Sequence, residues 1–389
     1  MFWTVLRWVV LAGAVLPFLY YLLAIYSAWR FFRRRRLEPL PDFTPSVSIL
    51  KPVRGVDREA YENFASFCRL HYAEYEILFC AEQGDPSIPI IEKLIGDFPA
   101  RQIRLLVGYE ELGASGKVNK LCRLVREARH EVLVISDSDI RVGTDYLGEV
   151  VAPLRDPQVG AVTSMYLGLA DRQLAAELEV IGHSADFFAG VLVAWQLEGV
   201  KFALGATIAT MRARLAEIGG FEALVDCYVD DYELGKRIAA RGYRVELAPA
   251  VVWTMYPAET LRGFFAHQLR WALAVRHSRP GGHFGMVFTQ GLPWAVVAAV
   301  VAPSAGVAVA AGYLAVYLAL RLGMAWTVGV WGLKDPLLRR KWWLVPLRDA
   351  TAFLVWLASF FRSRINWRGD EFYVRKGRLI PIEPRAARG

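Results

Sequence analysis

The chain has 389 residues, of which 55% are hydrophobic and 22% carry a charge. This composition is too apolar for an ordinary soluble enzyme and too charged for a bundle of membrane helices alone, so it predicts a hybrid of the two. The net charge of +8 could suit nucleic acid, but the 13 Trp and 21 Phe stand beside apolar runs, which favours anionic lipid headgroups and excludes nucleic acid as the expected partner.

The first 29 residues are almost continuously apolar, and only Arg7 interrupts them. A stretch of this length can cross a hydrocarbon core of about 30 Å, so we expect a transmembrane helix in residues 1–29. A cleaved signal peptide is the alternative, but no small-residue cleavage site follows the stretch. The basic linker 30–46 comes next, and its arginine cluster predicts by the positive-inside rule that the following domain is cytoplasmic.

Residues 47–258 alternate short β-branched runs with longer amphipathic stretches, which is typical of an α/β domain. We expect strands at 47–50, 75–80, 104–107, 131–136 and 160–163. Between them, helical spacing of apolar residues predicts helices at 58–70, 88–98 and 117–128. One mostly parallel, Rossmann-like sheet covered by helices is the economical fold, and its ligands should lie beyond the carboxyl ends of the strands.

The C-terminal part becomes apolar again, and residues 287–302 and 306–330 are each long enough to span a membrane on either side of a break at Pro303. A third segment, 342–361, contains a proline and two charged residues and has basic flanks on both sides. Because a full crossing would export one basic flank, an interfacial or re-entrant segment is favoured over a third crossing. The remaining boundaries are then an amphipathic interfacial segment at 259–284, membrane segments at 285–361 and a basic tail at 362–389.

The strongest chemical signal follows the expected strand at 131–136, where Asp137 and Asp139 stand one residue apart. Two such carboxylates can reach one hard divalent cation, which can bridge the oxygens of a diphosphate. A nucleotide-sugar donor needs this chemistry, because its leaving group is a nucleoside diphosphate. The structural alternative is a solvated strand-to-loop turn capped by aspartate, and an isolated Asp-x-Asp is more often that.

A second acidic pair, Asp230 and Asp231, precedes a predicted helix. An acidic pair at this place is commonly only an N-cap that suits the helix dipole. A transferase that uses a hydroxyl nucleophile nevertheless needs a general base near the sugar, and a carboxylate in a cleft is the usual supplier. Asp231 is therefore a candidate base.

The segment 259–284 mixes basic and aromatic residues, as expected for a helix at a membrane surface. Arg270 could offer its guanidinium to a phosphate, and Trp271 an aromatic plane to a sugar or acyl chain. A membrane-lying helix without a role in the active site explains the pattern equally well. Three further polar residues lie where a doubly wound sheet meets its ligand, although turn chemistry also explains them: Lys51, Arg54 and Asp85.

In this order, the motifs resemble the ceramide glucosyltransferase family, glycosyltransferase family 21, which includes bacterial hopanoid glycosyltransferase-like members. The resemblance runs from about residue 47 to 271 and continues through the flanking membrane segments. It rests on Ser-Ile-Leu-Lys-Pro-Val-Arg-Gly-Val-Asp at 48–57, Gly-Asp-Pro at 84–86, Gly-Lys-Val-Asn-Lys-Leu at 116–121, Ser-Asp-Ser-Asp-Ile-Arg-Val at 136–142, Ala-Asp-Arg-Gln at 170–173, Asp-Asp-Tyr at 230–232 and Arg-Trp at 270–271.

The resemblance implies a GT-A catalytic domain with transmembrane helices at both ends. Its first aspartate, which contacts the nucleotide, matches Asp85; its second matches Asp137, with Asp139 completing a metal-binding pair; its third, the general base, matches Asp231. The last motif of the family matches Arg270 and Trp271, which implies that these two residues are also catalytic. Nucleotide-binding residues implied with these are Lys51, Arg54 and Lys117.

One position departs from the family pattern, because His267 stands where Gln or Arg is expected. The implied reaction is an inverting transfer of a sugar, with glucose favoured, from a UDP-sugar to the hydroxyl of a ceramide-type lipid, with Mg²⁺ or Mn²⁺ holding the diphosphate. A hopanoid polyol that receives N-acetylglucosamine is the alternative acceptor. Two further alternatives are a processive polysaccharide synthase, which needs more spans, and a non-catalytic membrane protein that binds nucleotides or lipids.

Overall fold

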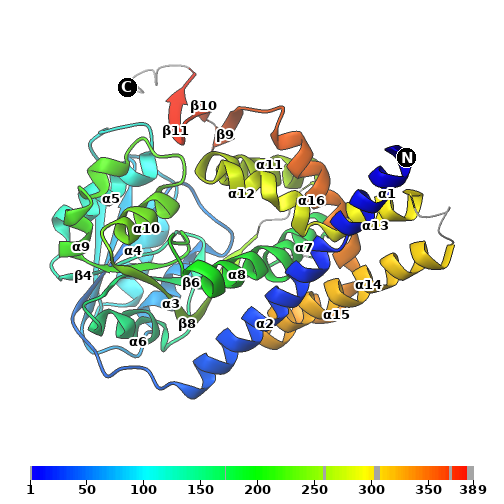
Figure 1. Cartoon of the computed structure of the whole chain (residues 1–389). Coiled ribbons are helices and arrows are strands. Elements are labelled where there is room, and N and C mark those ends of the chain that lie inside the picture. Colours follow the sequence, from blue (N-terminus) through cyan, green and yellow to red (C-terminus); the bar gives the residue numbers. More distant parts are fainter. Residues whose placement is uncertain (1, 171, 257–259, 302–306, 368–369, 383–389) are drawn as a thin grey trace. The chain divides into compact units, whose positions relative to one another are not determined.

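The computed structural model describes residues 2–170, 172–256, 260–301, 307–367 and 370–382 and divides into two compact units (Figure 1). The sheet unit comprises Glu38–Ala170, Glu198–Pro257 and Arg364–Gly389. The helical unit comprises Met1–Leu37, Asp171–Leu197 and Ala258–Ser363. Three positions used in the sequence analysis lie outside the described residues: the predicted domain boundary at 258 and 259, the break at Pro303, and Asp171 of the motif Ala-Asp-Arg-Gln.

The sheet unit is built on eight strands in the order β3-β2-β1-β4-β7-β6-β8-β5. Neighbouring strands are parallel from β3 to β4 and again between β6 and β8, whereas β7 and β5 run antiparallel to their neighbours. The strands are β1 (Val47–Pro52), β2 (Tyr75–Ala81), β3 (Gln102–Val107), β4 (Val132–Ile135), β5 (Ile140–Arg141), β6 (Val159–Leu169), β7 (Ile208–Met211) and β8 (Arg244–Met255). The α/β class and all five predicted strands are confirmed.

Helices and short helical turns connect these strands: α3 (Ala60–Cys68), α4 (Ile88–Asp97), α5 (Gly116–Glu127), α6 (Tyr146–Val151), η1 (Ala152–Arg155), α9 (Arg212–Glu217), η3 (Phe221–Leu224) and α10 (Asp230–Ala240). The three helices predicted from the sequence coincide with α3, α4 and α5. Every residue of β1, β2 and β4 is buried, which explains why these strands read as continuous apolar runs rather than alternating ones.

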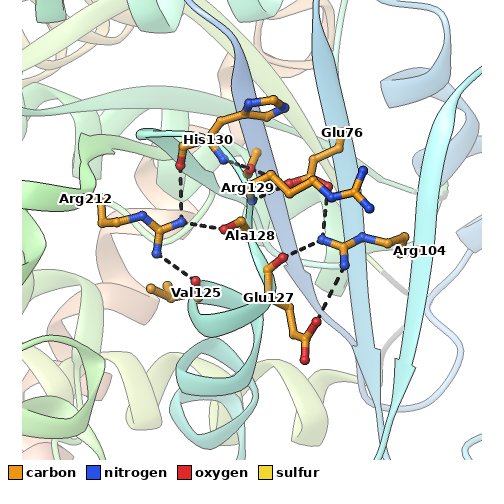
Figure 2. A network of polar contacts seen from close by, with 9 residues as sticks. Glu76, Arg104, Val125, Glu127, Ala128, Arg129, His130 and Arg212 are labelled. Atoms are coloured by element: carbon orange, nitrogen blue, oxygen red, sulfur yellow. Dashed lines mark hydrogen bonds and ion pairs between the residues drawn. The ribbon is translucent and has the colours of Figure 1, made fainter.

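Two arginines hold the segment around the end of α5 and the start of β4 against neighbouring parts of the sheet unit (Figure 2). Arg212 donates to the carbonyl oxygens of Val125 at 2.8 Å and Ala128 at 2.7 Å, which satisfies groups that a helix end leaves unpaired. Arg104 of β3 pairs with the buried Glu76 of β2 at 3.1 Å. These contacts hold one end of the sheet. The carboxyl ends of β1 and β4 lie at the other end, where a sheet of this kind usually binds its ligands.

The end of the chain adds a second sheet to this unit, although the sequence analysis grouped it as a basic tail. It has the order β11-β10-β9, with β9 (Arg364–Trp367), β10 (Asp370–Arg375) and β11 (Arg378–Pro381) pairing antiparallel. The backbone N–H of Leu379 donates to the carbonyl of Asp226 at 2.9 Å, and that of Tyr228 to the carbonyl of Gly377 at 2.9 Å. The second sheet therefore braces the loop that leads into α10.

The helical unit contains three helices that are long and apolar enough to cross a membrane, within the described residues: Trp3–Leu37, Leu174–Glu198 and Val307–Gly332. A pair bent by 52°, Pro280–Thr289 with Gly291–Val301, would make a fourth. Its elements are α1 (Phe2–Gly13), α2 (Leu16–Leu37), α7 (Leu174–Gly182), η2 (His183–Phe187), α8 (Phe188–Glu198), α11 (Leu261–Ser278), α12 (Pro280–Gly285), η4 (Met286–Thr289), α13 (Gly291–Val301), α14 (Val307–Ala325), η6 (Trp326–Gly332), α15 (Pro336–Lys341), η7 (Trp342–Leu344) and α16 (Val345–Ser359).

Residues 172–197 lie inside the α/β domain predicted from the sequence, whereas in the structure they cluster with the helical unit. The 18-residue apolar window of Leu174–Glu198 is 72% buried inside the protein, compared with 17% for that of Val307–Gly332. Glu177 and Glu179 lie within the helix Leu174–Glu198, and these charges concealed its apolar character at the level of sequence. The predicted domain boundaries otherwise stay a prediction.

The third predicted C-terminal segment folds mainly as α16, which has 15 residues. At 1.5 Å per residue it reaches about 22 Å, which is shorter than a hydrocarbon core of about 30 Å. Its Asp349 pairs with the buried Arg321 of α14 at 2.7 Å and accepts a hydrogen bond from the hydroxyl of Tyr317 at 2.8 Å. Charged residues inside this apolar segment are therefore paired within the unit, as such residues usually are.

Candidate active site

Two aspartates far apart in the sequence meet at one glycine of the sheet unit. A Cβ atom placed on Gly205 would lie 3.0 Å from Oδ2 of Asp231 and 3.1 Å from Oδ2 of Asp137. Asp137 follows β4 and Asp231 lies in the first turn of α10. Helix α10 reaches this place because its Gly235 packs directly on the backbone of Phe202, where a Cβ would meet the carbonyl carbon at 2.3 Å.

A lysine neutralises this acidic group. The ammonium of Lys117, in the first turn of α5, lies 2.7 Å from Oδ1 of Asp137 and 3.5 Å from Oδ2 of Asp230. Ser115 caps the helix, since its hydroxyl accepts a hydrogen bond from the N–H of Val118 at 3.4 Å. Although burial opposes it, the charge of Asp137, with that of Asp230, raises the pKa of Lys117. Positive charge is thus strongly favoured at this point.

Asp231 has the electrostatic character of a base. Burial, reinforced by the neighbouring charge of Asp230, raises the pKa of Asp231 to about 7. Its Oδ1 accepts a hydrogen bond from the N–H of Tyr232 at 2.7 Å, so the carboxylate is held in place. A carboxylate that titrates near neutral pH can take a proton from a hydroxyl group and release it again.

Two residues hold the loop after β4, Asp139 within the loop and Lys51 of β1. The hydroxyl of Thr254 on β8 donates to Oδ2 of Asp139 at 2.9 Å, which fixes that carboxylate at the sheet edge. Lys51, at the end of β1, is fully buried and donates to the hydroxyl of Ser136 at 3.2 Å and to the carbonyl of Asp137 at 2.9 Å. Burial lowers the pKa of Lys51 to about 7, and the charges of Asp137 and Asp139 oppose that shift. Lys51 therefore holds the loop through its hydrogen bonds to Ser136 and Asp137.

Asp85 holds the loop after β1. Its carboxylate accepts hydrogen bonds from the N–H of Gly55 at 2.9 Å and from the N–H and hydroxyl of Ser87 at 2.9 and 2.6 Å. Although burial opposes it, these hydrogen bonds hold the pKa of Asp85 below its usual range. Gly55 has φ = +73°, a backbone conformation that favours glycine. Arg54 lies on the same loop, half-buried, and a nucleotide contact for Arg54 or Asp85 stays a prediction.

Sequence reasoning missed two residues that organise this site, Gly205 and Asp226. The carboxylate of Asp226 accepts from the N–H of Ala114 at 3.0 Å, and the N–H of Ser115 donates to the carbonyl of Val225 at 2.7 Å. This loop therefore joins the start of α5, which carries Lys117, to the start of α10. The only sequence signal for Asp226 is that its loop precedes the acidic pair Asp230 and Asp231. Gly205 has no such signal.

The last predicted motif lies in the helical unit, on α11. Thr260 caps this helix, since its hydroxyl accepts from the N–H of Gly263 at 3.1 Å. Arg270 and Trp271 are both half-buried there. His267 contacts Trp271 directly, because the indole N–H donates to its Nε2 at 3.1 Å. Participation of Arg270 and Trp271 at Asp231, which belongs to the sheet unit, stays a prediction.

The described residues contain no group of three or more His, Cys, Asp or Glu side chains that could hold a metal ion by themselves. Asp137 and Asp139 nevertheless fit a hard divalent cation, because Mg²⁺ is commonly held by one or two carboxylates together with substrate phosphates. Asp137, together with Asp230, raises the pKa of Lys117, so positive charge is favoured beside Asp137. The donor set therefore suits an ion that arrives with a diphosphate.

The chain is similar to several known proteins. Ceramide glucosyltransferase 1 of Caenorhabditis elegans is 27% identical over 271 residues, which cover 67% of this chain and 56% of that protein. Ceramide glucosyltransferase 3 of the same organism is 25% identical over 275 residues, covering 68% and 58%. The chain thus spans a little more than half the length of these curated relatives.

The solved structure of the mannosyltransferase PcManGT from Pyrobaculum calidifontis, in complex with GDP-Man and Mn²⁺, matches 90% of this chain and 99% of its own with a TM-score of 0.50. At 20% identity this likeness shows the fold alone, and it confirms the expected GT-A-like architecture. The family model described as Glycosyl transferase family 21 matches residues 9–380. Because that match covers nearly the whole sequence, the resemblance of the motifs is confirmed, and the chain belongs to glycosyl transferase family 21.

Proposed function

We propose that this protein transfers glucose from UDP-glucose to the hydroxyl group of a ceramide-type lipid and forms a β-linked glycolipid. The observation that carries the proposal is the meeting of Asp137 and Asp231 at Gly205, with Lys117 paired to Asp137 and Asp230. Membership of the family and the names of the relatives, which are ceramide glucosyltransferases, support glucose and ceramide as the pair of substrates.

In the proposed reaction, Asp231 takes the proton from the acceptor hydroxyl, and the oxygen forms a bond to C1 of glucose. The bond from C1 to the diphosphate oxygen breaks on the opposite face, so UDP leaves and the configuration at C1 inverts. The ammonium of Lys117 is placed to offset the charge on the departing diphosphate. The pKa of Asp231, raised to about 7, suits this proton transfer near neutral pH.

We further propose that Mg²⁺ or Mn²⁺ is required. Asp137 and Asp139 would hold the cation, with remaining ligands from the donor diphosphate. A divalent cation at this place supplies Lewis-acid stabilisation of the leaving diphosphate. Lys51, which holds the carbonyl of Asp137 and the hydroxyl of Ser136, keeps the loop in the shape that presents both carboxylates.

The acceptor would reach the enzyme from the bilayer and the donor from the cytosol. The three long apolar helices of the helical unit support membrane insertion. Three arginines in the last turn of α2 (Arg34, Arg35 and Arg36) support, through the positive-inside rule, a cytoplasmic position for the residues that follow.

The test is a transfer assay with the purified full-length protein in lipid-containing micelles. It crosses UDP-glucose, UDP-galactose and UDP-N-acetylglucosamine with ceramide, diacylglycerol and a hopanoid polyol. We expect the pair of UDP-glucose and ceramide to react fastest, and preference for the hopanoid polyol with UDP-N-acetylglucosamine would contradict the proposal. The relatives reported above lend no support to a hopanoid acceptor.

The same assay tests the base. Asp231→Asn should lower kcat by about 10² to 10⁴, the usual contribution of general base catalysis, while UDP-glucose still binds. Asp145→Asn is the matched control, because Asp145 belongs to the same unit and is exposed. If Asp231→Asn kept activity within about tenfold of wild type, the assignment of the base would be wrong. A non-catalytic binding protein would show no turnover in any of these assays.

A further inference from the structure

Three side chains of the helical unit form a chain of hydrogen bonds that ends at Trp271, and we call them the Glu179 relay: Glu179, His267 and Trp271. The ring Nδ1 of His267 on α11 lies 2.7 Å from Oε1 of Glu179 on α7. The indole N–H of Trp271 donates to Nε2 of the same imidazole at 3.1 Å. The relay therefore uses both ring nitrogens of His267.

The donors and acceptors in the relay determine the tautomer of His267. An indole N–H can only donate, so Nε2 of His267 must carry a lone pair and act as the acceptor. The proton of a neutral imidazole then stays on Nδ1, from which it donates to Glu179. This arrangement requires an acceptor at Glu179, and protonation of His267 on Nε2 would break the contact with Trp271.

The carboxylate end of the relay is buried and held from a second side. The side chain of Glu179 is 3% exposed. Its Oε1 also accepts a hydrogen bond from Nε2 of Gln268 at 3.1 Å, and Oε1 of Gln268 accepts from Nη2 of Arg348 on α16 at 2.6 Å. The guanidinium of Arg348 packs over Gly182, where a Cβ would lie 2.2 Å from Nε. Helices α7, α11 and α16 thus meet at one polar chain.

The indole of Trp271 is also enclosed by rings from η2. It packs edge-on to His183 with a centroid distance of 4.9 Å and to Phe187 with a distance of 5.7 Å. Nδ1 of His183 lies 2.9 Å from the carbonyl of Glu179, so this ring is oriented by the same turn that carries the relay. A π-helical segment such as η2 is uncommon and occurs frequently at functional sites.

We propose that His267, oriented by Glu179, is a positioning residue that sets the direction of the Trp271 indole for glucosyl transfer. The inference rests on the proposed function and on the predicted participation of Trp271 in it. Neither His267 nor Glu179 needs to touch a substrate. A cluster that served only the packing of α7 against α11 would need buried polar partners but not an acceptor at the position of Nε2.

Two substitutions, each of which keeps a polar group near one of the two ring nitrogens, separate these roles. His267→Gln places an amide oxygen near the position of Nε2, where it can accept from Trp271. His267→Asn places its amide near the position of Nδ1, where it can contact Glu179 but does not reach Trp271. Both variants keep a polar side chain of moderate size, so packing alone predicts similar behaviour for the two. The relay predicts that only His267→Gln retains the orientation of the indole.

Glu179→Ala tests the other end, with Glu177→Ala as its matched control. Both glutamates lie on α7 and are buried, but Glu177 pairs with Lys341 of α15 at 2.5 Å, whereas Glu179 pairs with His267. We expect Glu179→Ala to disturb Trp271 and Glu177→Ala to leave it in place. Unfolding temperature is measured for all variants to identify any that fail to fold.

The experiment uses the full-length protein in nanodiscs, labelled with 5-fluorotryptophan, and the ¹⁹F resonance of Trp271 is assigned with Trp271→Phe. The resonance should move in His267→Asn and Glu179→Ala and stay near wild type in His267→Gln and Glu177→Ala. In the transfer assay, kcat should fall about tenfold in the first two, which corresponds to roughly 1.4 kcal/mol, while KM for UDP-glucose changes little.

An unmoved resonance in His267→Asn, or equal effects of Gln and Asn at 267, would overturn the inference. The resonance reports on the relay without any turnover, so it decides the inference even if wild-type protein transfers no glucose to ceramide. That last result would contradict the proposed function alone. If the resonance moves as expected but kcat stays at the wild-type value in every variant, the relay orients Trp271 without serving transfer, and the proposed role is wrong.

Discussion

The closeness of two carboxylates to Gly205 makes this glycine a sensitive place for a small change. Gly205→Ala would introduce a methyl group 3.0 Å from Oδ2 of Asp231 and 3.1 Å from Oδ2 of Asp137, whereas ordinary van der Waals contact begins at 3.4 Å. Gly205 does not have a positive φ, so alanine is compatible with its backbone. The substitution therefore acts on the two carboxylates rather than on the fold of the loop.

The size of the effect follows from these distances. Each carboxylate must retreat from the methyl group by a few tenths of an ångström. A misplacement of about 1 Å can cost about 10²-fold in rate. Smaller shifts at two reacting groups at once should lower kcat by roughly tenfold to a hundredfold.

The assay measures kcat and KM of purified Gly205→Ala with UDP-glucose and ceramide, and the control is Gly96→Ala. Gly96 lies on α4 in the same unit, and a Cβ there meets nothing within 4 Å. We expect the control to match wild type and both variants to unfold at similar temperatures. If Gly205→Ala kept kcat within about twofold of wild type, Asp137 and Asp231 would not form one reacting pair, and the proposed site would have to be abandoned.

Three further predictions concern the same unit. Asp230→Asn removes a charge that raises the pKa of Asp231. Activity is lost as pH falls through about 7, because Asp231 gains a proton, so this acid limb of the pH profile of kcat/KM should move to lower pH in the variant. An unmoved limb would contradict the coupling. EDTA should stop turnover and Mg²⁺ or Mn²⁺ should restore it, with Asp139→Asn raising the metal concentration required; turnover that persists in EDTA would refute the metal. Asp226→Leu removes the acceptor for the N–H of Ala114 and should lower the free energy of unfolding by about 1–3 kcal/mol in chemical denaturation. Asp226→Asn keeps an acceptor oxygen and should lower it less. Equal losses in the two variants would argue against this contact.

Much of the sheet unit could be predicted because its signals are local. The apolar run of β4, the acidic residues after it and the helical spacing in α5 lie within short windows, and their period indicates the element without knowledge of the rest of the chain. The family motifs also placed Asp137 and Asp231 in one site, and the structure brings these two together at Gly205. Metal binding at Asp139 and nucleotide contacts at Asp85 remain predictions.

Other features could not be read in this way. The helix Leu174–Glu198 carries glutamates whose partners, such as His267 and Lys341, are distant in sequence, so no local pattern indicates that these charges are paired inside the protein. The strands after residue 363 carry many charged side chains and resembled a tail, but they pair among themselves and with the loop at Asp226. In both cases a long-range contact overrides the local pattern.

By itself the sequence determined the order and type of the main elements, the apolar segments and the family, because hydrophobic period, run length and short motifs are properties of neighbouring residues. Only the tertiary structure decided that Asp137 and Asp231 both lie beside Gly205 and that Glu179 and Trp271 contact the two ring nitrogens of His267. These arrangements depend on distances between side chains that are remote in the chain, and packing of whole elements sets such distances.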